Sequence, residues 1–218
     1  MPFQTVLCDL DGTLVDAFTT IHRAYCHTLP QFGRLEPTMA EVRAAVGGGL
    51  RHAMARFLPE EQISAAIGVH QAYTARILLE DVHALPGVLA LLQALHARGV
   101  TLAVYTNKHG DAARRICAHL GFTPWLHGIY GAGDTPWLKP EPELAAYVLG
   151  ELKASAATTL LVGDSPFDIE SAHNGGFPCW TVTTGTHDAD QLAAAKADRV
   201  FPDLDALARE LYPLVRQA

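Results

Sequence analysis

Short apolar runs and stretches of helical periodicity alternate along most of this chain. Four of the runs are nearly continuous in β-branched and aliphatic residues, which is typical of parallel strands that are covered on both faces. These runs span residues 3–8, 100–105, 158–162 and 178–183. Polar residues follow the first three runs directly. Such residues do not suit the packing of a buried strand. The pattern predicts strands whose carboxyl ends carry polar chemistry.

Apolar residues at helical spacing fill the segments between and after these runs. Several of the segments begin with Pro and stop just before Gly, which is the asymmetry expected at helix ends. The predicted helices span residues 86–98, 111–120, 142–149, 166–174 and 203–215. The alternation of strand and helix predicts an α/β fold with a doubly wound parallel sheet, in which ligands bind at the carboxyl ends of the strands.

One stretch, from Asp16 to His83, breaks this alternation. It contains no convincing strand, and its apolar spacing predicts helices instead. These helices span residues 18–29, 38–46, 50–57 and 60–79. We therefore expect two domains. One is a sheet domain built from residues 1–15 and 84–218, and the other is a helical domain of residues 16–83. Because the helical stretch follows the first strand directly, it is in position to act as a lid over the carboxyl edge of the sheet.

Composition and charge restrict the partners of this protein. Hydrophobic residues make up 49% of the 218 residues, which is ample for a packed core. The formal net charge of −7 argues against a nucleic-acid partner, because such a partner requires a basic face. The charge is compatible with a small anionic substrate, since a metal ion or a local Lys reverses the field inside a cleft.

The sequence indicates neither membrane insertion nor secretion. Its apolar runs are too short to span a bilayer, and its N-terminus lacks the basic start and long apolar stretch of a signal peptide. The four Cys residues are scattered and form no C-x-x-C motif. These features predict a protein of the reducing cytoplasm with no membrane partner, either a monomer or a homodimer.

Two carboxylates stand at the end of the first predicted strand. Asp9 and Asp11 are two residues apart, so on extended backbone both project to one side, about 6–7 Å apart along the chain. Such a pair favours a hard cation such as Mg²⁺, or a division of acid and base roles. A simple turn at this Asp-Leu-Asp-Gly sequence is the alternative interpretation, and these residues alone leave both open.

Four short motifs in chain order resemble those of the haloacid dehalogenase (HAD) superfamily of phosphohydrolases. They are Asp-Leu-Asp-Gly-Thr-Leu at 9–14, Thr-Asn at 106–107, Lys-Pro-Glu-Pro at 139–142, and Gly-Asp-Ser at 163–165 with Asp168. Their order and spacing agree with the family, and the resemblance covers nearly the whole chain. It implies a Rossmann-like core domain with an inserted all-α cap domain at the helical stretch.

The resemblance also implies how these residues act on a phosphate ester. Asp9 would be the nucleophile that forms an aspartyl-phosphate. Asp11 would protonate the leaving alcohol and then take a proton from the hydrolytic water. Thr106 and Asn107 would hydrogen-bond the phosphoryl oxygens, and Lys139 would neutralise the charge shared by nucleophile and phosphate.

A Mg²⁺ cofactor is implied by the same resemblance. The Asp9 carboxylate, the main-chain carbonyl of Asp11 and the Asp164 carboxylate would hold the ion, and Asp168 would support that set of ligands. The metal is needed because a phosphate dianion and an aspartate otherwise repel each other.

A substrate contact from the helical stretch is also predicted. Gly47, Gly48 and Gly49 precede a predicted helix start, where backbone N–H groups can meet an anion, and Arg51 follows in the first turn. Arg51 is therefore a candidate substrate-binding residue. A flexible turn that carries a solvated Arg is the alternative.

Among the activities of the family, the residues favour hydrolysis of a small phosphorylated metabolite. Asp11 argues against dehalogenation, because dehalogenases of the superfamily lack this second acidic residue. Phosphonatases need a cap Lys, whereas the first Lys of this chain is Lys108, outside the predicted cap. The Gly-rich cap loop and the Thr-Gly-Thr-His sequence at 184–187 resemble the phosphoglycolate phosphatase branch.

Two alternatives remain open from the sequence. A β-phosphoglucomutase-like phosphotransferase shares the four motifs and a helical cap, although the cap loop here lacks the Arg-Leu-Lys-Gly type of run found in that group. A non-catalytic phosphate-binding module on the same fold would be expected to have lost one of the residues Asp9, Asp11, Lys139 or Asp164. All four are present.

Overall fold

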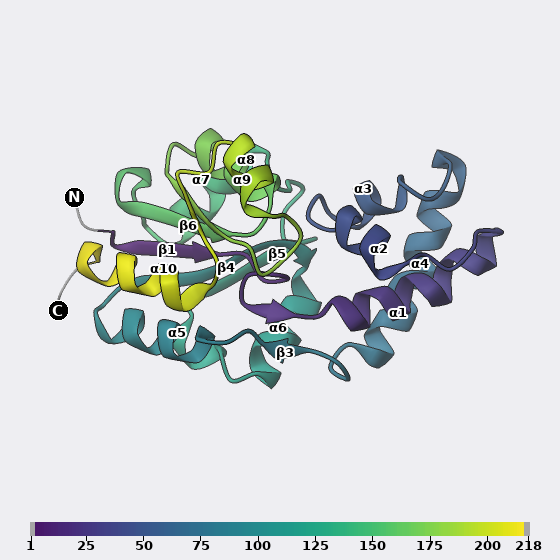
Figure 1. The fold of residues 1–218 in the computed structure, drawn as a ribbon, viewed down its shortest axis with the longest axis horizontal. Helices are drawn as coiled ribbons and strands as arrows, with labels where there is room; N and C mark the ends of the chain where they lie inside the picture. The colour runs from purple at the N-terminus through teal and green to yellow at the C-terminus, as the bar shows by residue number, and fades with distance from the viewer. Residues whose placement is uncertain (1–2, 216–218) are drawn as a thin grey trace.

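A parallel sheet of six strands forms the centre of the protein (Figure 1). The computed structural model describes residues 3–215, and within them the strands lie in the order β5-β4-β1-β6-β7-β8. Every neighbouring pair is parallel. The strands are β1 (Thr5–Cys8), β4 (Thr101–His109), β5 (Gly128–Ala132), β6 (Thr159–Gly163), β7 (Cys179–Val182) and β8 (Arg199–Phe201). The predicted α/β fold with a doubly wound parallel sheet is therefore confirmed.

The sequence predicted four of these strands and missed the two at the edges. β5 has the sequence Gly-Ile-Tyr-Gly-Ala, and its two Gly residues interrupt the apolar run that would mark a strand. β8 is three residues long and begins with an exposed Arg. β4 runs to His109, beyond the predicted end at Tyr105, because its pairing with β5 resumes at His109 and Ala132 after an irregularity in register.

Helices cover both faces of the sheet, as Figure 1 shows. Buried side chains of α5, α6 and α10 pack with β1 residues Val6 and Cys8, whereas those of α7, α8 and α9 pack on the other face with Leu7. This division follows from the alternation of side chains along a strand. The helices are α5 (Val88–Ala97), α6 (Gly110–His119), α7 (Pro142–Glu151), α8 (Pro166–Asn174), α9 (Ala189–Ala194) and α10 (Leu204–Leu211).

Two of these helices differ from the prediction. α9 was not predicted, and it is a six-residue helix whose start is stabilised by a capping box between Asp188 and Gln191. α10 ends at Leu211 rather than at Val215, because a 3₁₀ turn over Tyr212–Leu214 that contains Pro213 replaces its last turn. No helix within residues 3–215 is long and apolar enough to cross a membrane.

The stretch after β1 folds into four α-helices and a 3₁₀ turn (Leu29–Phe32) around a hydrophobic cluster of their own. The α-helices are α1 (Phe18–Thr28), α2 (Met39–Ala45), α3 (Leu50–Met54) and α4 (Glu60–Ile77). The cluster contains Tyr25, Val42, Met54 and Ile63, all buried. In Figure 1 these helices lie beyond the end toward which β1 points. We refer to them as the α1–α4 unit.

A two-stranded antiparallel ribbon closes the junction between the α1–α4 unit and the rest of the chain. It pairs β2 (Val15–Asp16) with β3 (His83–Ala84). The sequence analysis expected no strand here, because a two-residue strand carries no detectable periodicity. The ribbon brings the two points where the chain enters and leaves the unit side by side.

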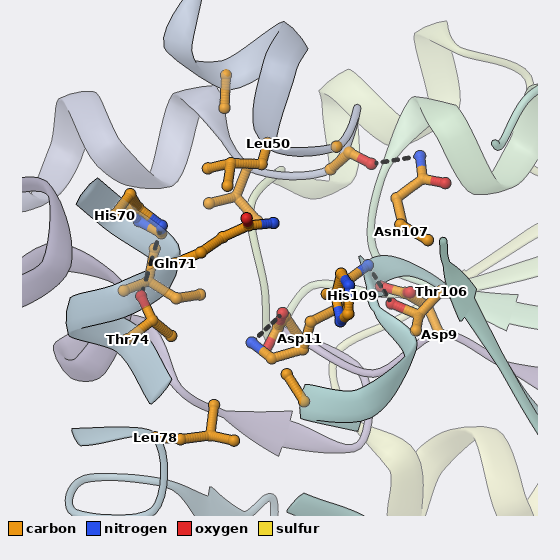
Figure 2. Close-up of a pocket in the computed structure, with 18 of the residues that line it drawn as sticks. Asp9, Asp11, Leu50, His70, Gln71, Thr74, Leu78, Thr106, Asn107 and His109 are labelled. Atoms are coloured by element: carbon orange, nitrogen blue, oxygen red, sulfur yellow. Dashed lines mark hydrogen bonds and ion pairs between the residues drawn. The ribbon is translucent and has the colours of Figure 1, made fainter. Parts of the chain in front are cut away.

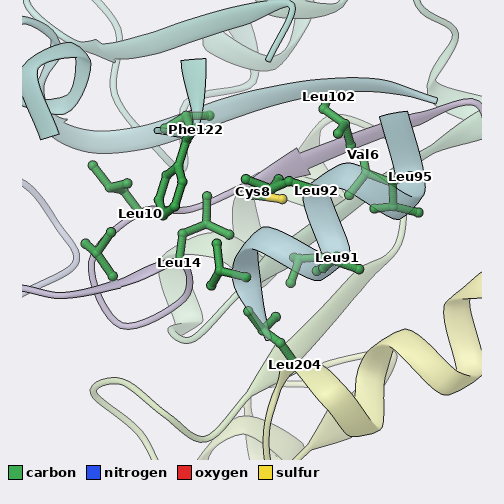
Figure 3. Close-up of a cluster of buried hydrophobic side chains, with 14 of the residues drawn as sticks. Val6, Cys8, Leu10, Leu14, Leu91, Leu92, Leu95, Leu102, Phe122 and Leu204 are labelled. Carbon is green, nitrogen blue, oxygen red and sulfur yellow. The ribbon is translucent and has the colours of Figure 1, made fainter. Parts of the chain in front are cut away.

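A pair of leucines on α5 tests the assignment of the core. Leu92 is fully buried beside Val6, Cys8 and Leu95 (Figure 3), whereas Leu89 is 41% exposed. We expect Leu92→Ala to lower the free energy of unfolding by about 2–5 kcal/mol because it leaves a cavity. Leu89→Ala should change it by less than about 0.5 kcal/mol. Urea unfolding measures both, and equal losses would contradict this packing.

Candidate active site

The three central strands, β1, β4 and β6, deliver polar residues to one edge of the sheet. Asp9 follows β1, Thr106 lies in the last part of β4, and Asp164 follows β6. Lys139 comes from the loop between β5 and α7. All four residues are buried. The carboxyl ends of these parallel strands therefore bring together residues that lie far apart in the sequence.

Lys139 lies between two carboxylates. Its Nζ is 2.8 Å from Oδ1 of Asp9 and 2.6 Å from Oδ1 of Asp168. Burial acts to lower the pKa of Lys139, but the charges of Asp168 and Asp9 outweigh this effect and raise it. Lys139 is therefore a buried ammonium ion that is shared by two acids.

Negative charge is crowded around this ammonium. One oxygen from each of Asp9, Asp164 and Asp168 lies within 4.8 Å of the others. Burial raises the pKa of Asp9 to about 6, although Lys139 opposes the shift. Burial, together with the charges of Asp168 and Asp9, raises the pKa of Asp164 well above its ordinary value. Three buried carboxylates and one ammonium ion leave an excess of negative charge, which a bound cation would stabilise.

Asp168 is held on both sides by the protein. It is the third residue of α8, and its Oδ2 accepts hydrogen bonds from Ser165 N at 3.1 Å and Ser165 Oγ at 2.7 Å. The Asp164 N–H also donates to this oxygen, while Oδ1 of Asp168 forms an ion pair with the ammonium of Lys139. Since both of its oxygens are engaged, Asp168 orients Lys139 and the turn that carries Asp164.

Asp164 is positioned by two segments from elsewhere in the chain. Its Oδ2 accepts hydrogen bonds from Thr186 N and Thr186 Oγ1, each at 2.8 Å, and Thr13 Oγ1 lies 3.3 Å from its Oδ1. Gly185 is packed so closely that an added Cβ would overlap Asp164 Oδ2. Gly12 is also packed against this oxygen, less closely than Gly185, and has a φ of +86°, which favours glycine. No contact of Thr186 or Thr13 was predicted from the sequence, in which only the neighbouring glycines indicate a close approach of the backbone.

Asp11 faces a second lysine rather than Lys139. Lys108 Nζ lies 2.9 Å and 3.1 Å from the two carboxylate oxygens of Asp11, and both side chains are nearly buried. Thr106 Oγ1 accepts a hydrogen bond from Lys108 N at 3.2 Å, so its hydroxyl hydrogen is left to donate elsewhere. This ion pair between Lys108 and Asp11 was not predicted from the sequence, where Lys108 was noted only as lying outside the predicted cap.

Asn107 was expected to bind phosphoryl oxygens, and in this structure its side-chain amide is engaged by backbone groups. Its Nδ2 donates to the carbonyl oxygen of Gly47 at 2.9 Å and to that of Lys139 at 3.0 Å. Its Oδ1 accepts from Lys139 N at 2.8 Å. The amide is thus fully engaged. It connects the end of β4 to the Lys139 loop and to the glycine loop of the α1–α4 unit.

Arg51 is not brought to the site in this structure. It lies on α3 with its side chain 56% exposed, and it forms an ion pair with Glu60. The glycine loop before it does line the central hollow, through Gly47 and Gly49. The glycine loop was therefore correctly expected near the site. The side chain of Arg51 points elsewhere because another face of α3 packs inward.

A hollow of about 370 Å³ separates the sheet edge from the α1–α4 unit. Figure 2 shows Asp9 and Thr106 on one side of it, with Asp11 between them and the α4 residues His70 and Thr74 on the opposite side. Apolar side chains form much of the wall, among them Ile21, Val46, Leu50 and Leu78. The site thus has a charged end and a largely apolar body.

His70 is a buried polar group at the far side of this hollow. Its Nδ1 lies 3.4 Å from Thr74 Oγ1, its ring packs edge-on against Tyr25, and its Nε2 has no hydrogen-bond partner. Burial lowers the pKa of His70 to about 4, and the charge of Lys108 acts in the same direction. At neutral pH His70 is therefore an uncharged imidazole.

Comparisons with known proteins find relatives that match most of this chain. The sequence model of a family described as haloacid dehalogenase-like hydrolase matches residues 6–182. The chain is 34% identical to a protein of Dickeya dadantii named Probable phosphatase IndB, over 97% of this chain and 94% of that protein. It is 31% identical to a plasmid-borne phosphoglycolate phosphatase of Cupriavidus necator, over 98% of this chain and 95% of that protein.

A solved structure also shares the fold. The crystal structure of a predicted phosphoglycolate phosphatase from Haemophilus somnus superposes on this chain with a TM-score of 0.86 at 26% sequence identity. The superposition covers 95% of this chain and 97% of that one, so it includes both the sheet and the α1–α4 unit.

The lowered pKa of His70 predicts a specific loss of stability in acid. The unfolded chain takes up a proton at this His near the ordinary pKa of 6.5, whereas the folded chain does so only near pH 4. The contribution of His70 to the free energy of unfolding is therefore fully present above about pH 6.5. It is lost as the pH falls toward 4, and the loss amounts to about 3 kcal/mol. We expect His70→Phe to lose less stability than the wild type between pH 7 and pH 4.5 in urea unfolding. Parallel losses would contradict the buried neutral state.

Proposed function

This chain belongs to the haloacid dehalogenase-like hydrolase family and is a phosphatase, and we propose that it hydrolyses a small phosphorylated metabolite with Mg²⁺ through an aspartyl-phosphate on Asp9. The observation that carries the proposal is the buried cluster in which Asp9, Asp164 and Lys139 meet at one end of a hollow. The relatives named as phosphatases, which align over nearly their whole length, support the same reaction.

Asp9 is the nucleophile in this mechanism. One of its oxygens forms a bond to phosphorus while the bond from phosphorus to the ester oxygen breaks. Lys139, at 2.8 Å from Asp9, holds the carboxylate in place and offsets the charge that builds up between it and the phosphoryl group. Thr106 lies beside Asp9 with a hydroxyl hydrogen free to donate to a phosphoryl oxygen.

Asp11 moves the protons in both steps. In the first step it gives a proton to the leaving alcohol oxygen, so that a neutral alcohol departs. In the second it takes a proton from a water molecule whose oxygen attacks phosphorus, which breaks the bond to Asp9 and releases inorganic phosphate. Lys108 fixes the position of Asp11 between Asp9 and the body of the hollow through both carboxylate oxygens.

The residues at the charged end fit a Mg²⁺ ion. Hard oxygen ligands are what this ion prefers, and the three crowded carboxylates share a single ammonium ion, that of Lys139. The carboxylates of Asp9 and Asp164 and the main-chain carbonyl of Asp11 would hold it, while Asp168 supports the set because its own oxygens are engaged. When bound, the ion supplies the positive charge that lets a phosphate dianion approach a carboxylate.

We also propose that residues 16–83 act as a cap domain over a core domain of residues 1–15 and 84–218. The β2–β3 ribbon, where the chain enters and leaves, is a short two-stranded hinge. The hydrogen bond from Asn107 to Gly47 is one point of contact between the cap loop and the end of β4. Closure would exclude water from the aspartyl-phosphate until the alcohol has left.

Replacing the nucleophile tests the reaction. With Mg²⁺ and p-nitrophenyl phosphate, we expect Asp9→Asn to lower kcat by roughly a thousandfold or more, because an amide cannot form the intermediate. Asp190→Asn, which removes an exposed carboxylate on α9, is the matched control and should retain wild-type turnover. Phosphate release that survives Asp9→Asn, or a wild type that releases none from a broad panel of phosphoesters, would refute the proposal.

Metal binding predicts a change in stability that does not depend on turnover. At a Mg²⁺ concentration about 100-fold above Kd, the wild type should gain about 2.7 kcal/mol. For a chain of this length the gain corresponds to a rise in Tm of about 5–10 °C over the protein in EDTA. Asp164→Asn removes a ligand, so its Tm should respond much less at matched ionic strength. An equal rise in both proteins would place the ion elsewhere.

A further inference from the structure

Side chains from three segments of the sheet side pack against the glycine loop (residues 47–49) of the α1–α4 unit. Asn107 Nδ2 donates to the first carbonyl oxygen of the loop, that of Gly47, at 2.9 Å. A Cβ added at the second glycine would lie 2.6 Å from the ring of Phe167, and one added at the third would lie 3.3 Å from Leu138. The loop therefore rests on groups that are far apart in the sequence.

Each of these side chains is the chain neighbour of a residue at the charged end of the hollow. The pairs are Thr106 with Asn107, Lys139 with Leu138, and Asp168 with Phe167. A contact of α2 follows the same pattern, because Arg43 Nη1 donates to the carbonyl oxygen of Gly185 at 3.2 Å. Gly185 precedes Thr186, whose N–H and hydroxyl hold Asp164. The α1–α4 unit thus touches the sheet side one residue away from the groups of the charged end.

Asn107 makes the most direct of these connections because its amide contacts both sides at once. Besides Gly47, its Nδ2 donates to the carbonyl oxygen of Lys139 at 3.0 Å, and its Oδ1 accepts from Lys139 N at 2.8 Å. Asn107 is buried, and both of its amide hydrogens are in use. If the Gly47 carbonyl moved away, one buried N–H would lose its partner, and a rotation of the amide to regain one would disturb the bonds to Lys139.

The main chain of Lys139 matters for the chemistry because it carries the shared ammonium. Nζ of Lys139 lies 2.8 Å from Asp9 and 2.6 Å from Asp168. A misplacement of about 1 Å in such a group can cost about a hundredfold in rate. A shift of the glycine loop would therefore reach the nucleophile by way of Asn107 and Lys139.

We propose that Asn107 is a positioning residue that couples the seating of the glycine loop to the placement of Lys139 against Asp9. This inference rests on the proposed phosphatase function and assigns the coupling to one amide. Since such a coupling is reciprocal, a phosphoryl group bound at the charged end would also favour the seated loop.

A substitution in the loop tests the coupling from the side of the α1–α4 unit. Gly47 has a φ of +121°, and an added Cβ would lie 3.0 Å from the Phe167 ring, so Gly47→Ala should displace the carbonyl that Asn107 binds. With Mg²⁺ and p-nitrophenyl phosphate, we expect kcat to fall by about tenfold or more and KM to stay within about threefold. Gly68→Ala on α4, where an added Cβ meets no atom within 4 Å, is the matched control and should keep both values.

A double-mutant cycle tests whether Asn107 carries the effect. In an Asn107→Ala background the connection is already cut, so adding Gly47→Ala should change kcat by less than about twofold. Asn174→Ala removes another hydrogen bond to the Lys139 segment, the one from Asn174 Nδ2 to the carbonyl oxygen of Pro140 at 2.9 Å. In that background Gly47→Ala should still lower kcat by about tenfold.

Binding of orthovanadate gives a measurement that does not require turnover. This anion imitates the phosphoryl group during transfer, so its Kd in the presence of Mg²⁺ should follow kcat. Isothermal calorimetry should show it about tenfold weaker in Gly47→Ala than in the wild type, and equally weak in Asn107→Ala with and without Gly47→Ala.

The outcomes separate this inference from the proposed function. An active wild type whose folded Gly47→Ala variant keeps kcat, or loses equally in the presence and absence of Asn107, would overturn the coupling and leave the phosphatase function standing. If Asn107→Ala does not fold, Asn107→Ser replaces it in the cycle. If neither folds, the comparison of Gly47→Ala with Gly68→Ala decides, since equal kcat values would overturn the coupling. A wild type that releases phosphate from no ester would overturn both.

Discussion

The buried ammonium of Lys139 is the interaction on which the rest of the site depends. It lies within 2.8 Å of both Asp9 and Asp168, and so connects the end of β1 with the first turn of α8. Without it, carboxylates that are almost wholly removed from water would face each other with no compensating charge. Asn107 holds the main chain of Lys139 on both sides through N–H and carbonyl contacts. The position of one cation is thus set by three separate segments of the chain.

The parallel sheet explains why these segments meet. β1 lies between β4 and β6, and the strands end at the same edge, so each contributes a polar residue to one place. The α1–α4 unit then faces this edge and supplies an apolar wall with a few polar groups. Under the proposed mechanism, the charge on the sheet side acts on the phosphoryl group, and the helices face the leaving alcohol.

Much of the fold was predictable, and the exceptions have physical reasons. Central strands such as β1 and β6 are continuous apolar runs because both of their faces are buried, whereas the edge strand β5 has glycines and left no such signal. Of the residues expected in the site, Arg51 lies on the exposed face of α3. The side-chain amide of Asn107 spends its hydrogen bonds on backbone groups. Residue type suggests a chemical capacity, but the direction of a side chain depends on which face of its element packs inward.

The sequence by itself determined the alternation of strand and helix, the helical stretch between residues 16 and 83, and the acidic and basic residues at the strand ends, because these are local patterns of side-chain polarity. Only the tertiary structure decided the partners: Lys108 with Asp11, Lys139 with Asp168, and Thr186 with Asp164. It also placed His70 at the far side of the hollow. Each of these contacts joins segments that local periodicity cannot relate, since their distance depends on strand order and on how the helices pack.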